Sequence, residues 1–315
     1  MRKTGKPWGV VLVSSFFLTV VAHQGCAEGS FTDARARAAA SSVLVDPATL
    51  SGWLGQGYGT DAFGYARLVV LDVSTPSAYA AGHVPGSFNL DTTTELTASR
   101  SGGIGGSYSY TDTNAVVWSE LNAPAEVASA EMMNALMRRT GIDRNTVVAL
   151  AGDSLLNVGL AYFNFRYWGF PKERLRVLDR TKAAYVTAGF TLTTAVPPAP
   201  APSAYGVCDL TQNTSLRANL TDMIRLAEGA APGAIAWDVR TAGEFNGGAG
   251  LTAGPFAGKA GYAKKVAFEG HVNGAVHLAY SDLLTGAGST FLDAAAAKTL
   301  LDGKGITRDV RTHIY

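Results

Sequence analysis

The sequence LDVSTPSAYAAGHVPGSFNL, residues 71–90, returns in altered form between residues 237 and 278. The second copy begins WDVRTAGEFNGG and ends FEGHVNGAVHL, with a Gly-rich insertion between the two parts. Each copy opens with apolar residues that lead to an aspartate, and each later reaches a Gly-His-Val-x-Gly segment. The chain therefore contains a tandem repeat, and we expect one fold to be built twice.

The repeat extends beyond these two stretches. Residues 68–73 and 235–239 are nearly continuous apolar runs, which is the pattern of a parallel strand buried on both faces. Farther along, LMRRTGIDRNTVVALA at residues 136–151 aligns without a gap with LLDGKGITRDVRTHIY at residues 300–315. By this alignment Tyr315 corresponds to Ala151.

Predicted strands and helices alternate, which indicates an α/β fold. The expected elements of the first copy are a helix over 125–140 that Gly141 ends, strands over 146–151 and 175–178, a loop over 152–159 and a helix over 160–168. Those of the second copy are helices over 216–228 and 293–301 and strands over 235–239 and 310–315. The predicted fold class is two tandem domains, each a mainly parallel sheet flanked by helices, with the second incomplete.

The length and a proline-rich stretch support two domains. A chain of 315 residues suggests two domains of roughly 100 to 150 residues each. Residues 194–206 begin TAVPPAPAPSAY, with four of the twelve prolines, and are expected to form a stiff, extended linker. The predicted domains are residues 43–193 and 207–315.

Composition excludes several classes of protein. The chain is 47% hydrophobic and 16% charged, which is typical of a globular protein with a core and not of a disordered one. A net charge of +1 gives no general attraction to nucleic acid. Five histidines and two cysteines lack the spacing of metal ligands, so we expect neither a metal nor a cofactor.

Residues 1–27 have the features of a signal peptide. A basic start precedes a 13-residue apolar run at residues 10–22, and small residues stand at positions 25 and 27. We therefore expect export to the periplasm or beyond the cell, with cleavage before Glu28 and no membrane span in the mature chain. The alternative is a lipoprotein modified at Cys26. Cleavage after Ala27 would leave Cys208 as the only thiol, so no internal disulfide is expected.

Two motif pairs give the chain a resemblance to a known family. Asp-Val-Arg-Thr-x-x-Glu-Phe at residues 238–245, followed by Gly-His-Val-x-Gly-Ala at residues 270–275, resembles the two-domain rhodaneses, which are thiosulfate or 3-mercaptopyruvate sulfurtransferases. The related pair in the first copy strengthens the resemblance, which covers residues 43–315. The resemblance implies two rhodanese-like domains, of which the first is non-catalytic.

The resemblance also implies a covalent sulfur-transfer chemistry. In this family a cysteine directly follows the central strand, and the backbone N–H groups of a short loop stabilise its thiolate and then a persulfide. The implied partners are a small anionic sulfur donor, namely thiosulfate or a mercapto acid, and a thiol or cyanide as the acceptor.

The nucleophile position is not filled by a cysteine in either copy. The repeat alignment places it at Gly152 in the first domain and directly after Tyr315 in the second. We therefore expect the chain that ends at Tyr315 to be inactive, and the ending to be a fragment boundary, a mutation or a UGA codon recoded as selenocysteine. The alternative function is a non-catalytic rhodanese-like module that binds a partner or a sulfur species.

The candidate site residues lie in the second copy. The resemblance gives Asp238 and Arg240 a supporting role beside the active-site loop, and a purely structural ion pair is the equal alternative. Lys264 and Lys265 are candidates for binding the anionic donor, against the alternative of a solvated, charged loop. His83 and His271 are expected to be turn residues, and Cys208 a buried or incidental cysteine without a catalytic role.

The sorting prediction has a direct test. Mass spectrometry of the exported protein should find Glu28 at the new N-terminus, because cleavage is expected after the small residues at positions 25 and 27. A lipid on Cys26, or a cytoplasmic protein that keeps Met1, would contradict it.

Overall fold

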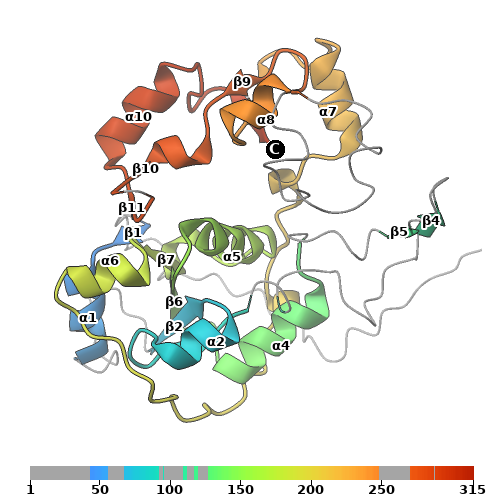
Figure 1. Cartoon of the computed structure of the whole chain (residues 1–315). Helices are drawn as coiled ribbons and strands as arrows, with labels where there is room; N and C mark the ends of the chain where they lie inside the picture. Colours follow the sequence, from blue (N-terminus) through green and yellow to red (C-terminus); the bar gives the residue numbers. More distant parts are fainter. Residues whose placement is uncertain are drawn as a thin grey trace, which may run out of the picture. The chain divides into compact units, whose positions relative to one another are not determined.

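The structure is a computed structural model of the whole chain (Figure 1). It describes residues 43–55, 67–91, 95, 109–111, 117–119, 127–247, 270–286 and 288–315. The expected signal peptide lies outside these residues, as do Lys264 and Lys265. Residues 32–315 belong to one compact unit.

A parallel five-stranded sheet forms the first half. Its strand order is β1-β7-β6-β2-β3, and every neighbouring pair is parallel. The strands are β1 Leu44–Val45, β7 Leu175–Leu178, β6 Thr146–Gly152, β2 Arg67–Val73 and β3 Phe88–Asn89. The apolar runs predicted as strands occupy β2, β6 and β7, which confirms those assignments.

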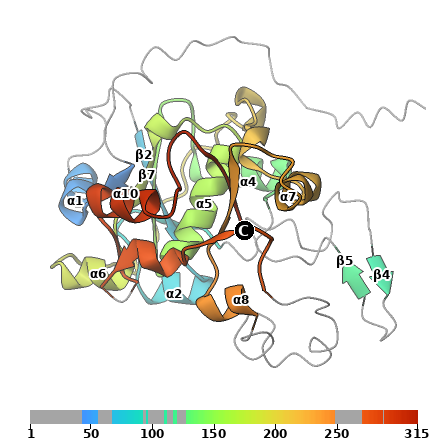
Figure 2. The same cartoon turned by 90° about the horizontal axis from the view of Figure 1, so that it is seen from above.

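Helices cover both faces of this sheet. The helices are α1 Pro47–Gly55, α2 Pro76–Ala81, α4 Ala130–Thr140, α5 Leu155–Tyr167 and α6 Lys182–Thr187. Side chains alternate along a strand, so Leu71 packs with α4 and α5 on one face while Val70 packs with α1 and α6 on the other. In both views α1 and α6 lie together, away from α4 (Figures 1 and 2).

Two helix starts differ from the predicted ones. Helix α4 starts at Ala130 and not at 125, because the Ser129 side chain accepts a hydrogen bond from Met132 N–H and caps it there. Gly141 ends it in the left-handed conformation, with φ 65°, as predicted. Helix α5 starts at Leu155, within the expected loop. Its buried side chains include Leu155 and Val158, so packing outweighs the loop preference of Gly159.

The second half repeats the centre of the first sheet. Its sheet has the order β12-β8-β9 and only parallel pairs, with β12 at Arg311–Ile314, β8 at Ala234–Asp238 and β9 at Val276–His277. Trp237 pairs with Ile314, as Leu71 pairs with Leu150 in the first sheet. The register confirms the repeat deduced from the sequence.

Shorter elements complete the second half. Helix α7 Leu220–Ala227 precedes β8, α8 Ala242–Asn246 follows it, and α10 Ala294–Asp302 takes the place of α4. Helix α7 starts four residues later than predicted because Asn219 caps it. The remaining elements are β4 Ser109–Thr111, β5 Val117–Ser119, β10 Leu284–Thr285, β11 Thr290–Phe291, η3 Lys172–Arg174, η4 Val207–Asp209, η5 Thr214–Leu216 and η7 Tyr280–Leu283.

The second sheet is smaller than the first. Within the described residues it has no counterpart of β7 and β1, so β12 lies at its edge. Ile314 on β12 is 58% exposed, whereas its counterpart Leu150 is completely buried. The two sheets agree with the predicted α/β fold class of mainly parallel sheets flanked by helices.

The connection between the two sheets has no regular secondary structure. Residues 194–206 form neither helix nor strand, and the expected domain boundaries on either side of them remain predictions. Among the described residues, no helix is long and apolar enough to cross a bilayer.

Gly152 at the end of β6 is packed closely against β2 and α5. A Cβ atom at Gly152 would lie 2.5 Å from the Val73 carbonyl oxygen and 3.1 Å from Val158 Cγ2. Gly152→Ala should therefore lower the free energy of unfolding by about 1–3 kcal/mol, because the strands must move apart.

A matched variant tests the cause. Gly159 in α5 has nothing within 4 Å of an added Cβ, so Gly159→Ala should stabilise the protein by about 0.5–1 kcal/mol. Urea unfolding of both variants measures the difference. Equal midpoints for the two variants would show that the contact with Val73 is not the cause.

Candidate functional site

Asp238 and Arg240 form an ion pair at the carboxyl end of β8. The Asp238 carboxylate is fully buried, and the Arg240 side chain is about one-third exposed. Arg240 Nε donates to Asp238 Oδ1 at 3.0 Å and Nη2 donates to Oδ2 at 2.5 Å, while the Arg240 backbone N–H also donates to Oδ1, at 2.9 Å. This fork-like contact fixes the plane and direction of the guanidinium.

Arg240 also joins the strand to the Gly-His-Val-x-Gly turn. Its Nη2 donates a hydrogen bond to the Gly270 carbonyl oxygen at 2.7 Å. The turn that the sequence repeats is therefore held to the strand end through the side chain that the sequence singled out.

Tyr315 completes the cluster. Its hydroxyl accepts a hydrogen bond from Val272 N–H at 2.9 Å and is also hydrogen-bonded to Asp238. The Arg240 guanidinium carbon lies 5.4 Å from the centre of the Tyr315 ring, within the range of a cation–π contact. The Tyr315 backbone is hydrogen-bonded to the residues on either side of Asp238. Tyr315 N–H donates to the Trp237 carbonyl oxygen, and Val239 N–H donates to the Tyr315 carbonyl oxygen.

The charges in the cluster are well defined. Burial would raise the pKa of Asp238, but hydrogen bonds and the positive charge from Arg240 outweigh burial and hold this pKa below its ordinary value of 3.8. The hydrogen bond to Asp238 raises the pKa of Arg240. Burial, together with the nearby Asp238 charge, raises the pKa of Tyr315. At neutral pH the site therefore contains a carboxylate, a guanidinium cation and a neutral phenol.

The histidines of the two repeated turns are structural. His271 Nδ1 hydrogen-bonds to Phe245 O at 2.8 Å and its ring stacks on Phe245 at 3.8 Å, and His83 is placed in the same way on Tyr79. The expectation that both are turn residues is confirmed. His277, in β9, is also held by the backbone, because its Nε2 lies 2.9 Å from the Arg240 carbonyl oxygen.

In the first domain a buried lysine lies beside Asp72, which is the counterpart of Asp238. Lys182 Nζ lies 3.2 Å from Asp72 and 3.3 Å from Asp153, and it donates to the Gly82 carbonyl oxygen at 3.0 Å. Ser74, the counterpart of Arg240, donates to Asp72. Burial raises the pKa of Asp72 in spite of these partners. The two equivalent aspartates thus have pKa values shifted in opposite directions.

Sequence reasoning missed Tyr315 and Lys182 as parts of these clusters. Tyr315 could have been found, because the repeat alignment puts it beside the aspartate strand in the place of Ala151. Lys182 is far from Asp72 in sequence and lies outside the repeated motifs. Nothing in the sequence around it indicates that it contacts Asp72.

Other candidates are not brought to the site. Lys264 and Lys265 lie outside the described residues. Cys208 is exposed, which leaves the incidental reading of this cysteine and not the buried one. The absence of an internal disulfide was expected for the chain cleaved after Ala27, and it stays a prediction. The described residues contain no free cysteine and no cluster of three or more ligands suited to a metal.

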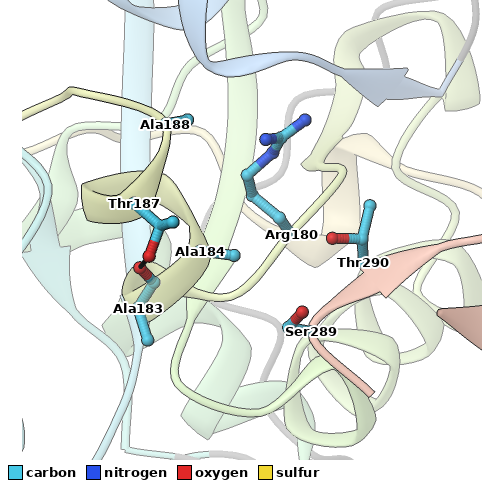
Figure 3. Close-up of a pocket in the computed structure, with 7 residues that line it drawn as sticks. All are labelled: Arg180, Ala183, Ala184, Thr187, Ala188, Ser289 and Thr290. Carbon is cyan, nitrogen blue, oxygen red and sulfur yellow. Dashed lines mark hydrogen bonds between the residues drawn. The ribbon is translucent and has the colours of Figure 1, made fainter. Parts of the chain in front are cut away.

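A hollow lies away from the Asp238 cluster, and its polar side chains are largely engaged within the protein. It measures about 510 Å³ and is lined by Arg180, Ala183, Ala184, Thr187, Ala188, Ser289 and Thr290 (Figure 3). Arg180 Nε donates to Asp179 at 2.7 Å and Thr187 Oγ1 donates to the Ala183 carbonyl at 3.0 Å. We favour the cluster of Asp238, Arg240 and Tyr315 as the functional site. Its charges converge at the carboxyl ends of parallel strands, where α/β folds bind ligands.

Solved structures share this arrangement of strands and helices. SseA from Escherichia coli, whose structure describes the rhodanese fold of the 3-mercaptopyruvate sulfurtransferases, superposes with a TM-score of 0.59 at 14% identity. The match covers 87% of this chain and 88% of SseA. The fold is the rhodanese fold.

A second group of structures has the same fold in a longer chain. EanB matches with a TM-score of 0.61 at 15% identity, over 86% of this chain and 59% of EanB. The anaerobic ergothioneine biosynthesis enzyme of Chlorobium limicola, solved with trimethyl histidine, matches with a TM-score of 0.56 at 15% identity, over 86% and 60% of the two chains. No protein-family model and no curated protein matches this rhodanese-fold chain.

The opposite pKa shifts predict opposite effects of pH on two variants. Asp238 adds stability above its unfolded pKa of about 3.8 and loses it as the pH falls through its lower folded pKa. Asp238→Asn should therefore cost about 1–3 kcal/mol at pH 7, and this cost should shrink in acid.

Asp72 provides the matched comparison. Its raised folded pKa means that the wild-type protein gains stability from this group as the pH falls toward 3.8. The gap between the wild type and Asp72→Asn should therefore widen in acid. Urea unfolding at neutral and acidic pH measures both gaps, and the same trend for both variants would refute the assigned charges.

Proposed function

We propose that this rhodanese-fold chain is part of an exported sulfurtransferase. It would move sulfane sulfur from thiosulfate or a mercapto acid to a thiol or cyanide, through a persulfide on a nucleophile directly after Tyr315. The observation that carries the proposal is the Asp238–Arg240–Tyr315 cluster, which presents a fixed cation at the carboxyl end of β8 and beside the last residue of the chain.

The proposed reaction has two balanced steps. The nucleophilic thiolate attacks the outer sulfur of thiosulfate, the S–S bond breaks, and sulfite leaves with the electron pair. Cyanide then attacks the terminal sulfur of the persulfide, which releases thiocyanate and restores the thiolate. A selenolate at the same position would follow the same two steps.

Arg240 would act on the sulfur through its charge. A nearby cation lowers the pKa of a thiol and stabilises a thiolate or persulfide anion. Arg240 is held in one direction by Asp238 and Gly270, and its pKa is raised, so this cation persists at every physiological pH. Asp238 would therefore be a positioning residue, acting through Arg240.

Tyr315 would place the nucleophile. Its backbone is paired on both sides with β8, and its hydroxyl is bonded to the turn and to Asp238. The residue that follows would consequently begin a loop at the strand end, next to the guanidinium. Lys264 and Lys265 are proposed to attract the anionic donor, by charge alone.

A non-catalytic binding module is the second candidate function. The observation that favours it is the exposed third of the Arg240 side chain, which an anion can reach without any nucleophile. Such a module would use the same Arg240 cation to bind a sulfur oxyanion or an acidic partner, without turnover.

Enzyme assays distinguish the two functions. Protein ending at Tyr315 should form no thiocyanate from thiosulfate and cyanide above background. The coding sequence after Tyr315 should supply a cysteine or UGA codon, and protein extended with it should turn over. A different stop codon with no related reading frame behind it would leave the binding module.

Two variants of the extended protein test the division of roles. Asp238→Ala should lower kcat/KM by on the order of 10-fold to 100-fold, because Arg240 loses its orientation and about 1.4–2.7 kcal/mol of transition-state stabilisation. Asp72→Ala should leave the activity of each folded molecule unchanged. Equal losses for the two variants, or turnover by protein ending at Tyr315, would defeat this assignment.

A further inference from the structure

A polar hollow lies at the opposite end of the second sheet from Asp238. It measures about 240 Å³ and is lined by Asp222, Arg225, Ala230, Ala231, Pro232, Ala234, Arg311 and His313. Helix α7 supplies Asp222 and Arg225, β8 supplies its first residue, Ala234, and β12 supplies Arg311 and His313. Four strand steps separate Ala234 from Asp238, which is roughly 13 Å along β8. The hollow is therefore separate from the proposed sulfur-transfer site.

His313 is the buried polar group of this hollow. It is only 7% exposed, and its side chain makes no hydrogen bond or ion pair within the part of the chain that the structure describes. Its ring nitrogens are not among the fully buried atoms that lack a partner, so the exposed part of the side chain opens into the hollow that it lines. The imidazole is therefore held in place by burial and can hydrogen-bond to a group bound in the hollow.

Two arginines border the same space. Arg225 and Arg311 are exposed, and neither forms an ion pair with a described residue. Asp222, the only carboxylate of the lining, is engaged at the start of α7, where it accepts a hydrogen bond from Asn219 N–H at 2.9 Å. The hollow therefore has an excess of hydrogen-bond donors and of positive charge.

The repeat shows that these polar residues are specific to the second copy. Arg311 and His313 correspond to Val147 and Ala149 in β6, which are 0% and 1% exposed and belong to the apolar interior. The same strand position is thus satisfied by small apolar side chains in the first domain. The second domain instead places an arginine and a histidine there, and both line the hollow.

We propose that this hollow binds a small tetrahedral oxyanion of the phosphate or sulfate class. Guanidinium groups match such anions with paired N–H donors, and the largely buried imidazole can add one donor. The volume of about 240 Å³ is sufficient for one such group. The proposal does not depend on the proposed sulfur transfer, because the hollow is at the amino end of the strands.

Calorimetric titration of the full chain with inorganic phosphate, and separately with sulfate, tests the proposal at constant ionic strength. We expect saturable binding with a Kd on the order of 1 mM or tighter. His313→Ala and Arg311→Val, which copy the first domain, should each weaken binding by about 10-fold, as expected for loss of a charge-assisted hydrogen bond.

Two further variants control for folding and for general charge. Arg308→Ala removes one exposed cation of the same domain outside the hollow and should bind as the wild type does. If His313→Ala or Arg311→Val fails to fold by circular dichroism, Arg225→Ala on the surface of α7 replaces it, with the same expected loss. No saturable binding by the wild type, or an equal loss in Arg308→Ala, would overturn the proposal.

Discussion

A buried carboxylate at the end of a central parallel strand is the constraint on which both halves of this protein depend. Asp72 and Asp238 are each fully buried, and a buried charge is tolerated only when donors surround it. In the first domain the donors come from Ser74, Lys182 and the turn backbone. In the second domain they come mainly from Arg240, with Tyr315 between the carboxylate and the turn. Each domain thus joins its turn to its strand end through the buried aspartate, with a lysine and a serine in the first domain and an arginine and a tyrosine in the second.

The cations of the two clusters differ in their exposure to solvent. Lys182 is almost completely buried, so its charge is neutralised within the first domain. Arg240 keeps about one-third of its side chain in contact with solvent while its direction is fixed. Only the second arrangement leaves a positive charge that an outside anion can reach.

The repeat made much of the fold predictable, because two copies of one pattern support each other. Strands β2, β6, β7 and β8 were recognisable from apolar runs, and the register of β8 with β12 follows the gapless alignment. Helix starts were less predictable, since capping by Ser129 and Asn219 and the packing of Leu155 decided them. Asp238 and Arg240 could be selected from sequence, but the Lys182 contact could not, because it joins residues about a hundred positions apart.

The closeness of Gly152 to the Val73 carbonyl has a consequence for how the two copies could have diverged. Any side chain at Gly152 must displace the neighbouring strand, while Lys182 already occupies the charged space beside it. A single codon change to a larger residue at this position would therefore not be enough, since the β2 backbone and Lys182 would both have to move. The first copy is constrained to glycine here by its own packing, whatever residue the other copy has at the matching place.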